Sequence, residues 1–416
     1  MLKMFSLIGY EFKKIIKNKV NIISILIMTL IILYSFIPKI INYSTTTEDN
    51  DLLKGKKAVR YETNYLNERF DKPLASNKIL GDIKDLKKLT KNTNEEFYDP
   101  KNYMDKKDYN SLFLPLGGYY SWISESYEGL DDKPYWVLSD LLNYNDKLDD
   151  FYNYRMMKVE KSINNSQTIK NHPKERQYWK EKAIRTNGPY NYGYYEGWSS
   201  INDTFDIYVL LILLVVAISI SGVFSRENES NMVSIILSSR NGVKKLSKAK
   251  IIASGLYIVL LSLIMILILT IPNLCFYGTS GWDFPVQILN TKILYSWNLL
   301  DLYLIRIAIS LVTALSFGSL CLFLSSITKK TYIVNVISML FIIASFLLPD
   351  VRNRLFVQIA MLLPLQLNGV LYYSYISYSL FGKIFNIYQI GPVINVLIMI
   401  LLSLIAALYF RKQELK

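Results

Sequence analysis

The stretch that decides the fold is residues 224–250, FSRENESNMVSIILSSRNGVKKLSKAK. It opens with two acidic residues, has a short apolar centre over residues 232–237 and ends in a group of lysines. Two long apolar runs flank it, residues 207–224 and 251–275. Each run has the roughly 18–25 residues that a helix needs to cross about 30 Å of hydrocarbon. The stretch is therefore predicted to be a loop between two membrane spans.

Similar apolar blocks recur along the 416 residues, and they predict an all-α membrane protein with six transmembrane helices. The expected segments are an interfacial helix at 1–19, a first span at 20–41, an extracellular domain at 42–206, a second span at 207–224, a cytoplasmic loop at 225–250, spans three to five within 251–348, an outer loop at 349–389, and the last span with its tail at 390–416. Only two cysteines are present, so no disulfide framework is expected in the large polar region.

The charge balance is strongly basic, with 47 Lys and Arg against 34 Asp and Glu. A net charge of +13 can indicate a nucleic-acid partner. Here most basic residues outside the large domain lie in the segments that the predicted spans place on one side of the membrane. An excess of Lys and Arg is typical of the cytoplasmic side. We therefore expect no nucleic acid, both termini in the cytoplasm, and residues 42–206 outside the cell.

The first nineteen residues have apolar side chains at helical spacing with lysines around them. The residues assigned to this face and its charged border are Phe5, Ile8, Glu11, Phe12, Lys13 and Lys14. The pattern is typical of an amphipathic helix that lies in the inner interface of a membrane. The alternative is a solvated start to the first span.

The large domain, residues 42–206, is expected to be mainly helical. Helical patterns cover residues 61–70, 79–89, 136–162 and 175–184, with turn residues between them. The aromatic segment YNYGYYEGW at 190–198 precedes the second span, and an aromatic belt at the outer interface explains it.

Residues 355–382 carry no charge before Lys383, but polar residues, Pro364 and Gly369 interrupt them. They are predicted to form a broken pair of helices, re-entrant or interfacial, on the outer side. The alternative is a seventh span. It would place Arg411 and Lys412 outside, against the positive-inside rule.

Motifs for catalysis are missing from the sequence. It has no phosphate-binding loop of the G-x-x-x-x-G-K-[ST] type and no H-E-x-x-H, and its one histidine, His172, lies in a polar stretch. Arg306 lies within a span, where an ionisable residue is a functional candidate. We expect it instead to extend to the nearby interface, with Asp301 as its partner.

The loop resembles that of the type-2 class of ATP-binding-cassette exporter permeases from Gram-positive bacteria. The matching positions are an acidic residue after the span, a small apolar helix, Ser-Arg-x-Gly and a lysine before the next span, here Glu227, Leu237, Ser239, Arg240, Gly242 and Lys250. The resemblance implies two copies of a cytoplasmic ATPase subunit that hold ATP and Mg, a second permease that is identical or paralogous, and contact with membrane lipid. It implies no cofactor bound by this chain.

The resemblance also implies that the loop couples the permease to the ATPase. The residues expected to do so are Glu227, Glu229, Met232, Val233, Ile235, Ile236, Leu237 and Arg240. The two glutamates are expected either to cap the loop helix or to pair with basic residues of the partner or of the amino-terminal helix. The four lysines that follow, Lys244, Lys245, Lys248 and Lys250, are expected to contact anionic lipid.

Two functions fit this architecture. The first is export of a hydrophobic or amphipathic cargo, such as a peptide, an antibiotic or a lipid-like molecule. The second is mechanotransmission or sensing through the extracellular domain, with no cargo crossing. An intramembrane enzyme is disfavoured because the spans lack a catalytic set of polar residues.

Overall fold

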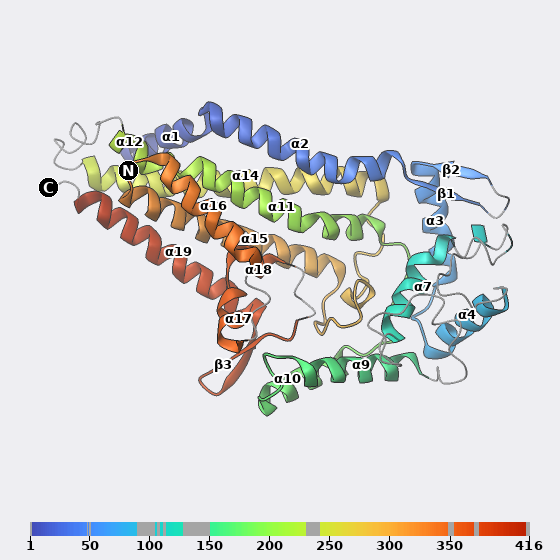
Figure 1. Cartoon of the computed structure of the whole chain (residues 1–416). Helices are drawn as coiled ribbons and strands as arrows, with labels where there is room; N and C mark the ends of the chain where they lie inside the picture. Colours follow the sequence, from blue (N-terminus) through green and yellow to red (C-terminus); the bar gives the residue numbers. More distant parts are fainter. Residues whose placement is uncertain are drawn as a thin grey trace.

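The long helices of the chain run side by side in one elongated bundle (Figure 1). The computed structural model describes residues 2–47, 49, 51–89, 105, 109–110, 114–127, 150–229, 242–347, 353–369 and 374–412. Both termini lie at one end of the bundle, which we call the terminal end. Helices α3, α4 and α7 lie at the opposite end, which we call the insertion end (Figure 1).

Five helices in the described part of the chain are long and apolar enough to cross a membrane. They are α2 (Lys19–Ile41), α11 (Glu196–Ile220), α14 (Gly242–Tyr277), α15 (Leu299–Ile327) and α19 (Ile387–Lys412). The fifth predicted span corresponds to α16 (Thr331–Leu347), which is apolar but shorter. The chain is therefore a mainly helical, multi-pass membrane protein.

Helix α11 is the centre of the bundle. In its most apolar window 78% of the residues are buried, against 28% for α2 and 22% for α19. A helix that is apolar on all sides and buried on most of them is a core helix. Helices α2, α14, α15 and α16 pack around α11, whereas α19 packs against α15 and α14. Helices α2 and α19 leave most of their apolar side chains on the outside of the bundle.

The start of α11 differs from the prediction. The helix begins at Glu196 rather than at residue 207, because its first turns carry polar residues that an apolar window leaves out. The aromatic belt predicted for 190–198 is also not found. Tyr190, Tyr192 and Trp198 are buried, and the ring of Tyr192 packs 5.0 Å from that of Phe70. These aromatic residues fill the core of the protein instead of lining its surface.

The amino-terminal segment forms α1 (Leu2–Ile16), as its amphipathic pattern predicts. The side chain of Asn18 accepts a hydrogen bond from the amide of Val20 and caps α2. The side chain of Asn21 then donates to the carbonyl of Ile15 at 2.9 Å. These polar contacts satisfy backbone groups at the break between α1 and α2 and so fix the turn.

The insertion domain, residues 42–195, is mainly helical in its described part. Its elements are β1 (Ser44–Thr46), β2 (Leu52–Lys54), α3 (Lys56–Arg69), α4 (Ser76–Leu89), α7 (Leu114–Tyr127), α9 (Phe151–Asn165) and α10 (Pro173–Arg185). The two strands are antiparallel, with Thr45 opposite Leu53, and were not predicted. Of the predicted helix over 136–162, residues 136–149 lie outside the described residues and the rest belongs to α9, which Asp150 caps.

The core of the insertion domain extends into the loop that joins α14 to α15. Aromatic residues of α7, α9 and α10 pack there, among them Trp122, Phe151 and Trp179. The indole nitrogen of Trp122 donates to the carbonyl of Gln287 at 2.9 Å, within the short helix η2 (Val286–Ile288). The insertion domain and this loop therefore form one packed unit.

The interrupted segment before the last span forms two short helices, α17 (Arg354–Ala360) and α18 (Pro364–Asn368). Neither is long enough to cross a membrane. The side chain of Asn368 donates to Thr313 Oγ1 at 2.7 Å and to the carbonyl of Pro364 at 2.8 Å. A β-hairpin that was not predicted follows, with β3 (Ser377–Leu380) paired to β4 (Lys383–Asn386).

A buried carboxylate joins the insertion domain to this segment. Glu175 of α10 accepts a hydrogen bond from Arg354 at 2.6 Å and another from the hydroxyl of Ser377 at 2.7 Å. The amide of Gln358 donates to the carbonyl of Ser377 at 2.7 Å. Helix α10 is therefore tied to both α17 and β3, far along the chain from it.

We expect Glu175→Gln to loosen this junction. The change removes the charge from a carboxylate that is 3% exposed, and hydrogen bonds to charged groups contribute about 1.5–3 kcal/mol each. Thermal unfolding should show the loss, and hydrogen exchange should become faster in the β3–β4 hairpin. Glu181→Gln, at an exposed position of the same helix, is the matched control. Equal exchange in the two variants would contradict the assignment.

Candidate functional site

The segment that follows α11 is the described part of the predicted coupling loop. It forms α12 (Gly222–Glu229), and α14 begins at Gly242. Most of the predicted coupling residues, Met232, Val233, Ile235, Ile236, Leu237 and Arg240, lie outside the described residues. The structure therefore places two members of that set, Glu227 and Glu229.

Glu227 belongs to a buried group of charges at the terminal end. Its Oε1 lies 2.7 Å from the ammonium of Lys250 and 3.3 Å from that of Lys14. The ammonium of Lys250 also lies 2.9 Å from Glu11 Oε2 and donates to the carbonyl of Val223 at 2.9 Å. We call Glu11, Lys14, Glu227 and Lys250 the buried ion cluster.

The buried ion cluster joins three helices that are distant in sequence. Glu11 and Lys14 lie on α1, Glu227 lies on α12 and Lys250 lies on α14. Its formal charges cancel, and the exposed fractions of Glu11, Glu227 and Lys250 are 5%, 4% and 1%. Charges that are buried this deeply remain ionised only when they are paired. The amino-terminal helix is therefore fastened by charge to the segment that leads into the predicted coupling residues.

Lys250 corrects the prediction for the lysine-rich half of the loop. It was expected to contact lipid with Lys244, Lys245 and Lys248, which are indeed exposed, but it is almost fully buried. Small buried residues surround it on its own helix at helical spacing, namely Ser247, Ala253 and Ser254. Such a stripe of small side chains lets another helix approach closely. This stripe of small residues, and Glu11 as the one acidic residue of segment 1–19, indicate a buried pair between α1 and α14. The prediction for Lys250 did not use these two signals.

The two glutamates of α12 have different partners. Glu227 pairs with Lys14, so the predicted pairing with the amino-terminal helix is found. The carboxylate of Glu229 instead accepts hydrogen bonds from the backbone amide of Thr331 at 2.7 Å and from its hydroxyl at 3.1 Å. An acidic group at this place satisfies the free amides at the start of α16. Glu229 therefore links α12 to the start of α16.

The break between α11 and α12 is closed by a serine of another span. Ser325 of α15 accepts from the backbone amides of Phe224 and Ser225, both at 3.0 Å, and donates to the carbonyl of Ser221 at 2.6 Å. The ring of Phe224 packs 4.8 Å from that of Phe410 on α19. Segment 221–229 therefore contacts α1, α14, α15, α16 and α19, so its displacement must move several helices.

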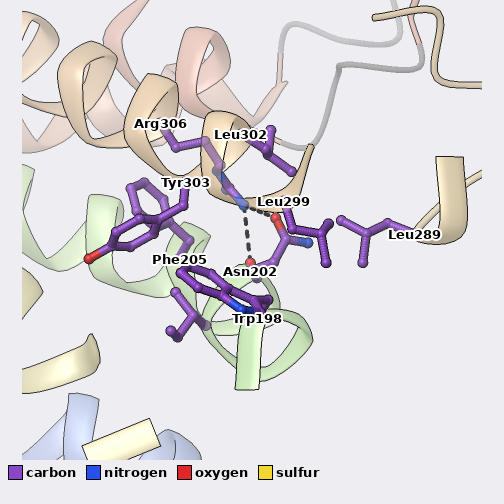
Figure 2. A pocket seen from close by; sticks show the side chains of 9 residues that line it. Trp198, Asn202, Phe205, Leu289, Leu299, Leu302, Tyr303 and Arg306 are labelled. Atoms are coloured by element: carbon purple, nitrogen blue, oxygen red, sulfur yellow. Dashed lines mark hydrogen bonds between the residues drawn. The ribbon is translucent and has the colours of Figure 1, made fainter. Parts of the chain in front are cut away.

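A second ionic group lies nearer the insertion end, around Arg306 of α15 (Figure 2). Its guanidinium donates to the carbonyl and to the side-chain oxygen of Asn202 at 3.1 and 2.6 Å, and it pairs with Asp206. It also donates to the carbonyl of Asn368 at 3.3 Å and lies 4.3 Å from the ring centre of Phe205. One side chain therefore connects α15 with α11 and α18.

The prediction for Arg306 was wrong in both respects. The residue is 4% exposed and does not extend to an interface, and Asp301 is not its partner. Asp301 forms a capping box with Asn298 at the start of α15. Residues five apart do not share a helix face, whereas Asp206 and Asn202, one turn apart on α11, do. The cavity beside Arg306 in Figure 2 is only about 10 Å³ and is too small for a cargo molecule.

A comparison with known protein families decides the class. The family model described as "ABC-2 family transporter protein" matches residues 19–409. The chain belongs to this family. It is therefore the membrane-embedded permease of an ABC transporter, a subunit that works with an ATPase. No curated protein and no solved structure matches this permease. Within its described residues, no group of three His, Cys, Asp or Glu side chains is placed to hold a metal ion.

Proposed function

We propose that this permease exports a hydrophobic or amphipathic cargo, using ATP and Mg held by a separate cytoplasmic ATPase subunit. The observation that carries the proposal is the buried ion cluster, which connects α1 and α14 to the segment beside the predicted ATPase contact. The permease itself performs no hydrolysis in this proposal, because its sequence has no phosphate-binding loop.

The orientation follows from where the basic residues lie. Lys13, Lys14, Lys244, Lys245 and Lys248 all lie at the terminal end, on α1 and at the start of α14. Basic residues beside spans favour the cytoplasmic side. We therefore propose that both termini are cytoplasmic and that the insertion domain is extracellular. Helix α1 would then lie along the inner surface, with the exposed Phe5 available to the lipid.

The mechanism is a transfer of motion through segment 221–229. When ATP draws two ATPase subunits together, the coupling residues Met232, Val233, Ile235, Ile236, Leu237 and Arg240 would move with them. Glu227 would carry this motion to α1 and α14, and Glu229 would carry it to α16. The cluster suits such a role because Glu11, Glu227 and Lys250 are buried, and they cannot separate without leaving an unpaired charge in the protein interior.

The packing of α11 favours a transporter made of two permeases. Because most of α11 is buried among α2, α14, α15 and α16, the centre of one bundle is filled with side chains. The apolar outer faces of α2, α14 and α19 are available to lipid and to a second copy or a paralogue. We propose that the cargo path lies between two permeases, each with one ATPase beneath it.

The contact between Glu175 and Arg354 favours a second candidate function, mechanotransmission. Because α10 is tied to α17, motion of the membrane helices would reach the insertion domain even without a cargo. Measuring ATPase activity together with cargo uptake into inside-out vesicles separates the two. Stimulated hydrolysis without uptake of any peptide, antibiotic or lipid offered would count against export.

The docking surface is tested by replacing Ile235 and Ile236 with Asp. We expect the ATPase subunit to be lost on co-purification, because two charges cannot enter an apolar cleft without a partner. Ile184→Asp is the control, since Ile184 is 67% exposed on α10 of the insertion domain. If the double variant retains the ATPase as fully as the control does, the docking surface lies elsewhere.

A further inference from the structure

An open cavity of about 420 Å³ lies between the insertion domain and the loop that joins α14 to α15. One wall is residues 185–191, which begin with the last residue of α10, and the other is formed by parts of residues 283–301. Its volume is within the roughly 300–1,000 Å³ that is usual for small-molecule sites. Neither the buried ion cluster nor the group around Arg306 is part of it.

The wall after α10 is positive. Arg185 lines the cavity and is exposed. Behind it, Arg155 is fully buried and donates from Nη1 to the side-chain oxygen of Asn187 at 3.1 Å and from Nε to the carbonyl of Thr291 at 2.9 Å. No carboxylate in the described ranges pairs with Arg155, and its burial lowers the pKa of the guanidinium. Its charge is therefore uncompensated within this wall.

The opposite wall is negative. Asp283 and Asp301 both line the cavity, and the backbone amide of Leu300 donates to the carbonyl of Trp282 at 3.0 Å, so their segments are adjacent. Asp301 uses one oxygen to cap the amide of Asn298. Asp283 is exposed and forms no ion pair within the described part of the chain. An ammonium group in the cavity would face both carboxylates.

Neutral groups complete the cavity. Trp297 lines it, and its ring stacks on Tyr295 with 4.2 Å between ring centres, which holds the indole in place. Gln287 also lines it and is 2% exposed. Both amide hydrogens of Gln287 are used, by the carbonyls of Ile293 and Tyr295, while its side-chain oxygen accepts from no described residue. That oxygen is available to a ligand in the cavity that donates a hydrogen bond.

We propose that this cavity binds a zwitterionic molecule with separated charges, namely a short peptide with free termini. The ammonium would lie at Asp283 and Asp301, the carboxylate at Arg185, and the chain between them beside Trp297. A cavity with one positive and one negative wall favours a ligand with both charges over a ligand with one. The inference rests on the proposed function for the extracellular location of the insertion domain, and it narrows the cargo or signal to a peptide.

The test is binding to the purified full-length permease in detergent, with no ATPase present. Unblocked trialanine is compared by calorimetry with its amino-acetylated and carboxy-amidated forms. We expect each blocked form to bind about tenfold or more weakly, since each loses one charge-assisted contact. Phosphoethanolamine tests the headgroup of a lipid as the alternative source of the two charges. Binding of phosphoethanolamine alone, equal binding of all three peptides, or no binding of any of them would overturn the proposal.

Two variants assign the charges to the walls. Asp283→Asn is expected to weaken trialanine but not the acetylated form, which has no ammonium. Arg185→Gln is expected to weaken trialanine but not the amidated form. Glu181→Gln, exposed on α10 and outside the cavity, should leave all three unchanged. If these binding results are obtained but the permease takes up no cargo into inside-out vesicles, the proposed export is refuted and the peptide site is not.

Discussion

Replacing Lys250 with methionine is expected to destabilise the permease by about 3–5 kcal/mol, the usual cost of removing one partner from a buried ion pair. Methionine retains much of the volume of the lysine side chain, so the packing against α1 changes little. What is lost is the ammonium that lies 2.9 Å from Glu11 and 2.7 Å from Glu227. The two carboxylates would then share the same buried space with Lys14 alone, and Lys14 is 45% exposed in its side chain.

Lys248→Met is the matched control, because it makes the same change two residues earlier on an exposed face of α14. Thermal unfolding compares the stability of the two purified variants. The stimulation of the ATPase subunit by each variant compares their function. We expect Lys250→Met to lose both stability and stimulation, and Lys248→Met to lose neither. Equal melting of the two methionine variants would show that the buried ion cluster contributes nothing.

The sequence predicted the membrane part of the fold better than its charged sites. Apolar blocks located the five described helices that are long enough to cross a membrane, because the length of a transmembrane helix is set by the bilayer. The same blocks could not locate the start of α11, since Glu196, Asp203 and Asp206 lie in its first turns. Lys250 and Arg306 were misassigned for a related reason. Hydropathy treats every charge as a surface residue, whereas pairing across helices determines which charges are buried.

The insertion domain was predicted only in outline, and tertiary contacts explain the difference. Tyr192 and Trp198 belong to an aromatic segment beside a span, where an interfacial belt is the usual explanation. Tyr192 packs against Phe70, Tyr119 and Trp122, and Trp198 packs against Tyr303, all of them far away in sequence. Helix periodicity does not reveal such long-range packing. The β3–β4 hairpin was missed because its residues, uncharged apart from Lys383, resemble those of a broken apolar helix.

Arg306→Met is expected to have the second largest effect, a loss of about 2–3 kcal/mol. This loss is smaller than that expected for Lys250→Met because the side chain of Asp206 is 39% exposed. Asp206 therefore keeps its contact with solvent after the arginine is removed. Arg306→Lys should cost about 1 kcal/mol, because lysine keeps the charge beside Asp206 but cannot reproduce the planar fork that contacts both oxygens of Asn202. The melting temperature should therefore be highest for the wild type, lower for Arg306→Lys and lowest for Arg306→Met.

The location of Arg306 separates its functional effect from that of Lys250. Arg306 holds the carbonyl of Asn368, so its loss should loosen α18 against α15, with the bond from Asn368 to Thr313 left in place, while the terminal end keeps its contacts. We expect Arg306→Met to retain the ATPase on co-purification and to lose cargo transport, whereas Lys250→Met loses the stimulation itself. Arg60→Met, at an exposed position of α3, controls for the removal of an arginine. Two outcomes would contradict the role of Arg306 in joining α15 to α11 and α18. One is that Arg306→Met has the same melting temperature as Arg60→Met. The other is that Asp301→Asn destabilises the protein as much as Arg306→Met does.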